Sequence, residues 1–188
     1  MMVSMPMRRR FFRVGVSALV AGTAASGALG MPRRASTPAD DIARLAFVNT
    51  HTGEKLDVVY RDGAQYLSDA IAEIDRVLRD HRSGEVFPID RALLDQLDRL
   101  GALLGTGARP FHVISGYRSP TTNATLAARS GGVATRSLHM SGRAIDIRMP
   151  GASLATVHRA ALSMGAGGVG FYPRSDFVHL DTGRVRTW

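Results

Sequence analysis

The stretch that decides the fold is a short loop followed by a strand, Ser137-Leu138-His139-Met140-Ser141-Gly142-Arg143-Ala144-Ile145-Asp146-Ile147-Arg148. Its second half alternates apolar and other residues, which is the period of a strand. Asp146 stands between Ile145 and Ile147, and a carboxylate among isoleucines is costly to bury unless it is paired or binds a metal. The stretch therefore predicts a buried strand with a candidate metal-ligating carboxylate, and His139 lies seven residues before that carboxylate.

A second strand pattern follows near the end of the sequence, Asp176-Phe177-Val178-His179-Leu180-Asp181. Because successive side chains of a strand point to opposite faces, His179 and Asp181 share one face. If the two strands are neighbours, His139, Asp146 and His179 meet around one cation. Two imidazoles and a carboxylate with an open fourth position are a ligand set of catalytic zinc sites. The spacing is equally compatible with a structural alternative, in which His139 caps a loop and Asp146 pairs with a nearby arginine.

The remaining pattern predicts an α+β protein with a small mixed or antiparallel sheet and flanking helices. Strands are expected at 45–49, 55–60, 111–115, 143–149, 169–172 and 177–181. Apolar residues at helical spacing indicate two helices between 66 and 104, separated by Pro88, with Asp90 as N-cap of the second. Shorter helices are expected at 121–130 and 153–164. The glycine-rich run at 165–170 lacks the Lys-Ser/Thr ending of a phosphate loop, so it predicts no nucleotide site.

Composition restricts the chemistry. The 188 residues include no cysteine, which excludes a disulfide framework, a thiolate zinc site, a cysteine nucleophile and a lipoprotein anchor. Any metal must therefore be held by His, Asp or Glu. The net charge is +8, but residues 1–30 contribute four arginines and no acid. The other basic residues are scattered among acids rather than clustered, so nucleic-acid binding is not expected.

The first 30 residues predict an export signal. Arg8-Arg9-Arg10-Phe11-Phe12-Arg13 precedes an uncharged apolar or small stretch at 14–29, and small residues follow near its end. The paired arginines resemble the twin-arginine export motif. The alternative is an uncleaved membrane anchor, although about 16 residues are short for a span of ~20. Residues 31–43 are expected to be a linker and residues 44–188 a single domain. Either interpretation places the body of the protein outside the cytoplasmic membrane, in the periplasm.

Several motifs together resemble one known family. Ser137-x-His139-x-x-Gly142-x-Ala144-x-Asp146 is similar to the signature of the zinc D-alanyl-D-alanine peptidases of the M15 group. The runs at 115–119 and 177–179 occur in the order that this group shows. The runs at 167–172, 177–183 and 184–188 are most similar to its murein endopeptidase K-like branch (DUF882). The resemblance covers about 45–188 and implies the hedgehog/DD-peptidase-like zinc fold.

The resemblance also assigns roles to residues. It implies that His139, Asp146 and His179 bind Zn²⁺. It implies that Arg118 binds substrate or stabilises the developing oxyanion, which suits a guanidinium beside a metal because negative charge grows on the carbonyl oxygen in the transition state. Ser137 matches a residue that lines the substrate cleft.

The general base is the position where the match is loose. The group usually places an acid three residues before the second histidine, which is Asp176 here. Strand phase instead favours Asp181, which points to the same side as His179. Both residues are therefore kept as candidates.

The expected function is that of an exported zinc metallopeptidase that hydrolyses peptide cross-links of peptidoglycan. Its partner would be the peptide stems of that polymer, and contact with the membrane would occur only through the export signal. The alternative is a non-catalytic cell-wall-binding or scaffolding domain of the same fold. The sequence leaves open whether the peptidase acts as an endopeptidase or a carboxypeptidase and which cross-link it cuts.

Overall fold

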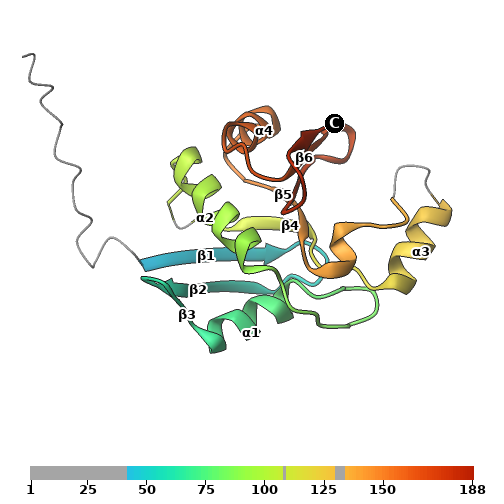
Figure 1. Ribbon diagram of the computed structural model, residues 1–188, viewed down its shortest axis with the longest axis horizontal. Coiled ribbons are helices and arrows are strands. Elements are labelled where there is room, and N and C mark those ends of the chain that lie inside the picture. The colour runs from blue at the N-terminus through green and yellow to red at the C-terminus, as the bar shows by residue number, and fades with distance from the viewer. Residues whose placement is uncertain (1–41, 108, 130–133) are drawn as a thin grey trace, which may run out of the picture. The chain divides into compact units, whose positions relative to one another are not determined.

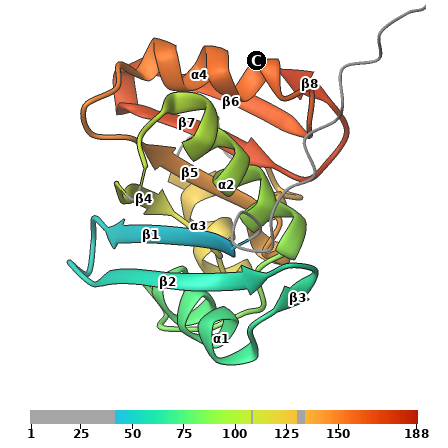
Figure 2. The same ribbon diagram turned by 90° about the vertical axis from the view of Figure 1, so that its left-hand side faces the viewer.

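The computed structural model describes residues 42–107, 109–129 and 134–188. Within them, eight strands form one sheet in the order β3-β2-β1-β4-β5-β7-β6-β8 (Figures 1 and 2). The strands are β1 (Ile42–Asn49), β2 (Lys55–Asp62), β3 (Gln65–Tyr66), β4 (Phe111–Ser115), β5 (Ala144–Arg148), β6 (Gly168–Tyr172), β7 (Phe177–Asp181) and β8 (Arg186–Thr187). The predicted α+β class with a mixed sheet is confirmed, although the sheet is larger than expected.

Most strand pairs are antiparallel, while β1 with β4 and β6 with β8 are parallel. The two strands that the sequence singled out, β5 and β7, are direct neighbours. In their register Asp146 lies opposite His179, and Ile145 lies opposite Leu180. The sheet therefore brings together the two halves of the predicted site.

Four helices accompany the sheet in the described residues: α1 (Ser68–Val77), α2 (Arg91–Leu104), α3 (Pro120–Arg129) and α4 (Leu154–Ser163). Figure 2 shows α2 crossing in front of the strands and α3 behind them. Helix α2 begins at the predicted cap, because the Asp90 carboxylate accepts a hydrogen bond from the Ala92 amide at 3.0 Å. Its apolar stripe is fully buried against the sheet and α4, and burial of such stripes is the main favourable contribution to folding. The stripe consists of Leu93, Leu94, Leu97 and Leu100.

Some boundaries differ from the prediction. Strand β1 begins at Ile42, and the side chain of Ala43 is buried, so the last two residues of the expected linker belong to the sheet. The strands β3 and β8 and the 3₁₀ helices η2 (Leu138–Ser141) and η3 (Pro173–Ser175) were not predicted, because two to four residues are too few to produce a period. The predicted export signal and the rest of the linker lie outside the described residues. No helix in the described part of the chain is long and apolar enough to cross a membrane.

Candidate metal centre

His139 is positioned by the short helix η2. The Ser137 side chain accepts a hydrogen bond from the His139 amide at its start, and Gly142 ends it with a φ of 65°. A Cβ at Gly142 would lie 2.1 Å from the Pro88 carbonyl oxygen, so only glycine fits this close approach. The buried His139 ring donates its Nδ1 proton to the Gly116 carbonyl oxygen at 2.7 Å, since a carbonyl can only accept. The other nitrogen, Nε2, is therefore the one that carries a lone pair.

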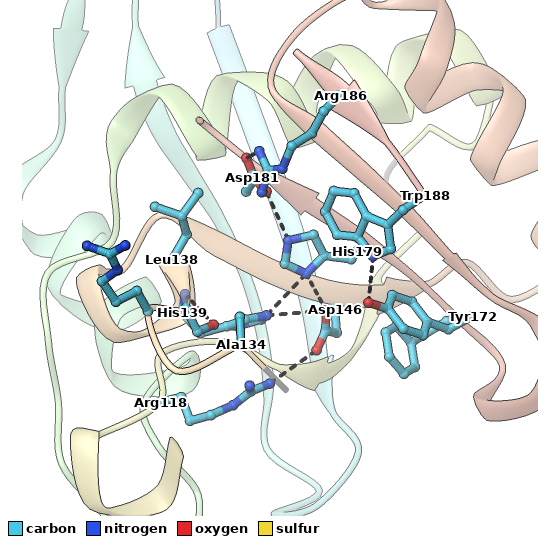
Figure 3. A pocket seen from close by; sticks show the side chains of 13 residues that line it. Arg118, Ala134, Leu138, His139, Asp146, Tyr172, His179, Asp181, Arg186 and Trp188 are labelled. Carbon is cyan, nitrogen blue, oxygen red and sulfur yellow. Dashed lines mark hydrogen bonds and ion pairs between the residues drawn. The ribbon is translucent and has the colours of Figure 1, made fainter. Parts of the chain in front are cut away.

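Asp146 and His179 meet this nitrogen from neighbouring strands. The His179 Nδ1 lies 2.8 Å from Asp146 Oδ1 and 3.2 Å from His139 Nε2, and His139 Nε2 lies 3.3 Å from Asp146 Oδ1. Figure 3 shows the three side chains converging on one point. The candidate ligand atoms all lie within 4.8 Å of one another. The three residues that the sequence predicted as ligands are therefore brought together.

The second nitrogen of His179 is also bonded. Its Nε2 lies 3.1 Å from Asp181 Oδ2, and an ionised carboxylate only accepts, so Nε2 carries a proton. In the neutral ring the lone pair is then on Nδ1, which faces Asp146 and His139. Two imidazole lone pairs and one carboxylate oxygen then face each other at about hydrogen-bond distance. Three acceptors so arranged repel one another unless a proton or a cation lies between them. The donor set therefore fits a metal ion bound by two His and one Asp.

Electrostatics agree with a site built for positive charge. Burial by itself opposes ionisation of Asp146, but His139 and His179 outweigh it and hold the pKa of this carboxyl well below its usual range. Burial likewise lowers the pKa of His179, yet hydrogen bonds and charges from Asp146 and Asp181 leave that pKa raised.

Arg118 reaches the same centre from the loop after β4. The Tyr117 amide donates to the Leu78 carbonyl at 2.8 Å, and the Arg118 amide donates to the His139 carbonyl at 3.1 Å. These bonds turn the guanidinium inward, where Nη2 lies 3.4 Å from Asp146 Oδ2. Arg118 is only 9% exposed and its Nε has no hydrogen-bond partner. A buried guanidinium with an unused donor is suited to bind an oxygen of a ligand.

Asp80 supports this loop and was missed by the sequence analysis. Its buried carboxylate accepts from the Ser119 amide at 3.0 Å, from the Ser119 hydroxyl at 2.7 Å and from the Arg82 amide at 2.9 Å. Asp80 follows α1 at a point without periodicity or motif. Its role depends on the approach of two segments about 40 residues apart, which the sequence alone does not reveal.

Asp181 lies at the centre, but its carboxylate is saturated. Oδ1 accepts from the amides of Gly168 and Gly183 at 3.0 and 2.8 Å and from Arg186 Nη1 at 3.1 Å. Oδ2 accepts from His179 and, at 2.6 Å, from Arg186 Nη2. Although the side chain is completely buried, these donors hold the pKa of Asp181 well below its usual range. The contacts place Asp181 behind the His179 ring, on the side away from the ligand atoms.

Asp176 is not brought to the centre. It follows η3 in a left-handed conformation with a φ of 52°. Its exposed carboxylate pairs with Arg148 at 2.8 Å, and these two residues line a separate depression with His112. The usual three-residue spacing of the group therefore places no acid at the metal centre in this chain.

A cavity of about 360 Å³ opens beside the ligand atoms. Arg118 and Ser137, two of the predicted residues, line it together with the three ligand residues and Asp181. Three further lining residues, Tyr172, Arg186 and Trp188, were not singled out from the sequence as site residues. The terminal run that contains Arg186 and Trp188 contributed to the family resemblance. This resemblance was the one feature of the sequence that could have identified them as site residues.

Comparisons with known proteins agree with the geometry. A family model described as "Peptidoglycan L,D-endopeptidase MepK" of the peptidase M15 type matches residues 37–188. The protein of that name from Escherichia coli (strain K12) is 47% identical over 174 residues, which is 90% of this chain and 94% of that protein. The Shigella flexneri protein gives the same values. A "Probable peptidoglycan L,D-endopeptidase MepK" from Haemophilus influenzae is 37% identical over 96% of this chain and 95% of its own length. The chain therefore belongs to the MepK family of M15 peptidases.

Proposed function

We propose that this protein is an exported zinc metallopeptidase that hydrolyses peptide cross-links of peptidoglycan. The observation that carries the proposal is the convergence of His139 Nε2, Asp146 Oδ1 and His179 Nδ1 beside an open cavity. Three protein ligands and a free coordination position distinguish a catalytic zinc site from a structural one. The names of the relatives support the substrate, and support the L,D bond of the cross-link as the bond that is cut.

Each ligand is held by a second contact. His139 is fixed through the Gly116 carbonyl, His179 through Asp181, and Asp146 through Arg118, whose Nη2 lies 3.4 Å from Asp146 Oδ2. Such outer contacts fix the tautomer and the ring orientation of a metal-binding histidine. When bound, zinc supplies a Lewis acid and lowers the pKa of a coordinated water.

Hydrolysis adds the hydroxyl of a water to the carbonyl carbon, and the departing amine gains a proton. Arg118 lines the cavity, its Nε has no hydrogen-bond partner, and its Nη2 lies 3.4 Å from Asp146 Oδ2. Its role in the proposal is to donate to the scissile carbonyl oxygen as negative charge develops there. Ser137 keeps its proposed place along the substrate cleft, next to the ligand that it caps.

The proposal revises the role of Asp181. A general base must come within about 2.6–3.2 Å of the proton that it removes. Asp181 is engaged by five donor contacts behind His179, and Asp176 is paired with Arg148 elsewhere. These contacts favour Asp181 as a positioning residue that holds the His179 tautomer and do not favour it as the base.

Location and fold type follow from the same proposal. A peptidoglycan hydrolase must act outside the cytoplasmic membrane, and residues 1–30 would direct it there by the twin-arginine route. We place residues 44–188 in the hedgehog/DD-peptidase-like zinc fold, on the basis of the order of the candidate ligands and the pairing of β5 with β7, the two strands that carry Asp146 and His179. Peptide stems of peptidoglycan are the proposed partner, and nucleic acid is not.

The test combines metal content with product analysis. Purified protein should contain one zinc per chain, and it should release monomeric muropeptides from isolated sacculi. A chelator should stop the release, and added zinc should restore it. Zinc-loaded protein that binds sacculi without releasing any product would instead identify a non-catalytic wall-binding domain.

A further inference from the structure

Tyr172 and Trp188 form one wall of the cavity beside the metal ligands. The Trp188 indole Nε1 donates to the Tyr172 hydroxyl oxygen at 2.6 Å, and the Trp188 ring lies 5.3 Å from the His179 ring. In the view of Figure 3 both rings stand on the side of His179 and Asp146 opposite to Leu138. The Phe177 ring stacks on Tyr172 at 4.6 Å and extends the wall.

The backbone is shaped to admit this wall. A Cβ on Gly170 would lie 2.8 Å from a ring carbon of Tyr172 and 2.8 Å from a ring carbon of Trp188. Glycine at this position lets both rings lie close over β6. Trp188 is anchored at the edge of the sheet, where its amide donates to the Val169 carbonyl and its carbonyl accepts from the Phe171 amide.

The hydrogen bond from Trp188 to Tyr172 leaves the hydroxyl proton of Tyr172 unused. A phenolic hydroxyl has one proton to donate and lone pairs to accept with. Trp188 occupies a lone pair of Tyr172, and no described residue accepts the Tyr172 proton. Because the indole fixes the oxygen, this proton is available to a group inside the cavity. Trp188 is itself 46% exposed, and the Arg186 guanidinium lies over its ring, 4.8 Å from the centroid.

The charge of the cavity indicates which group binds there. The guanidinium groups of Arg118, Arg136 and Arg186 line the cavity, together with the carboxylates of Asp146 and Asp181. Arg186 is committed to Asp181, whereas Arg136 is exposed and pairs with no described residue. A divalent cation at the ligand atoms would add two further positive charges. Such a cavity favours anionic ligands.

We propose that Tyr172 is a substrate-binding residue, positioned by Trp188, and that its hydroxyl donates to a carboxylate of the acidic cross-link peptide. This inference rests on the proposed function, because the peptide must lie in the cavity. A hydrogen bond to a charged acceptor contributes about 1.5–3 kcal/mol. Its loss therefore corresponds to a decrease of about 10- to 100-fold in kcat/KM.

The test compares wild-type protein and three variants on two substrates. Wild-type protein and Tyr172→Phe are compared on a cross-linked muropeptide with free carboxylates and on its amidated form. We expect Tyr172→Phe to reduce kcat/KM about 10- to 100-fold on the free form and much less on the amidated form, with zinc content unchanged. Trp188→Phe should cause a smaller loss of the same kind, through KM, because it removes the indole donor. Tyr66→Phe, which loses a hydroxyl bonded to Asp95 outside the cavity, is the matched control.

Two outcomes separate this inference from the proposed function. Equal losses on both substrates, or full activity of Tyr172→Phe in an active enzyme, would overturn the role of Tyr172 alone. Trp188 is the single tryptophan of the sequence, so its emission reports ligands in the cavity without turnover. If wild-type protein cuts neither substrate, a change in this emission with the free form that is weaker with Tyr172→Phe would support the inference while the proposed peptidase activity fails. No change in emission with wild-type protein would overturn the inference.

Discussion

His179 uses both ring nitrogens, one toward the other ligands and one toward Asp181. This double use makes the two contacts dependent on each other. Removal of the imidazole deletes a ligand outright, whereas a change at Asp181 leaves the ligand in place and frees it to rotate. Substitution of His179 should therefore abolish zinc binding, whereas substitution of Asp181 should weaken it.

We expect His139→Ala or His179→Ala to lose bound zinc and peptidase activity while the fold is retained, because each removes one of three ligands. Zinc per chain and muropeptide release measure the two effects, and circular dichroism measures the fold. His112→Gln is the matched control, because His112 lines a separate depression. Full activity in either ligand variant would exclude zinc hydrolysis at this centre.

Asp181→Asn should lower zinc affinity about 10- to 100-fold, the usual cost of losing an outer contact of a metal-binding histidine. Activity at limiting zinc should fall with it and recover partly when zinc is added. Asp176→Asn, which breaks an exposed pair with Arg148, should change activity little. If Asp181→Asn binds zinc normally and still loses turnover about 10²-fold, Asp181 is the general base.

The residues of the metal centre also show which features of a site can be predicted from a sequence. The candidate ligands were predictable because alternation marks His179 and Asp146 as polar groups on buried strands, and because the family resemblance assigns both of them and His139 to a zinc site. The contact that selects the His139 tautomer was not predictable, since it is the backbone carbonyl of Gly116. A carbonyl has no residue-type signature, and its use depends on how two loops approach each other.

At the scale of elements, the loop between α1 and α2 packs against the turn before β2. The rings of His51 and His81 stack there at 3.8 Å with 8° between their planes. Burial lowers the pKa of His81 to about 4, and the positive charges of His51 and Arg82 add to this effect. Asp80 opposes the shift and Arg118 favours it.

This stack should make stability depend on pH. The pKa of His81 is about 4 in the folded protein and about 6.5 in the unfolded chain, so protons bind preferentially to the unfolded state. Its contribution to stability is complete above pH 6.5 and decreases as the pH falls toward 4. The Tm of metal-free protein should drop over this range, and the drop should be smaller in His81→Gln. Parallel Tm curves for the two proteins would show that His81 does not cause it.

The elements themselves were predictable to the extent that they are long. Helix α2 begins at the expected Asp90 because an amphipathic stripe and a cap coincide there. Strand β8 has two residues and exists because Arg186 and Thr187 pair with β6. The glycines of β6 likewise have no local explanation: they make room for Asp181 and for the rings of Trp188 and Tyr172.

At the scale of the whole molecule, we expect the chain to combine a leader with a metal-binding domain. The twin-arginine route carries folded proteins, so the domain would acquire its metal before export. We expect the double substitution Arg8→Lys with Arg9→Lys to retain the protein in the cytoplasm, as measured by cell fractionation. Arg33→Lys with Arg34→Lys, in the expected linker, is the control pair. Normal periplasmic yield of the first variant would mean that the leader uses another pathway.

Because Asp146 lies directly opposite His179, an error in the register of β5 and β7 would change the metal centre. If β5 and β7 paired one residue out of step, Ile145 or Ile147 would face His179, and no carboxylate would stand beside the imidazole. Such a mispaired sheet would lack one of the three ligands. If the centre binds zinc as proposed, only molecules with the correct strand register would retain it, and the zinc content after refolding would measure the fraction of correctly assembled molecules.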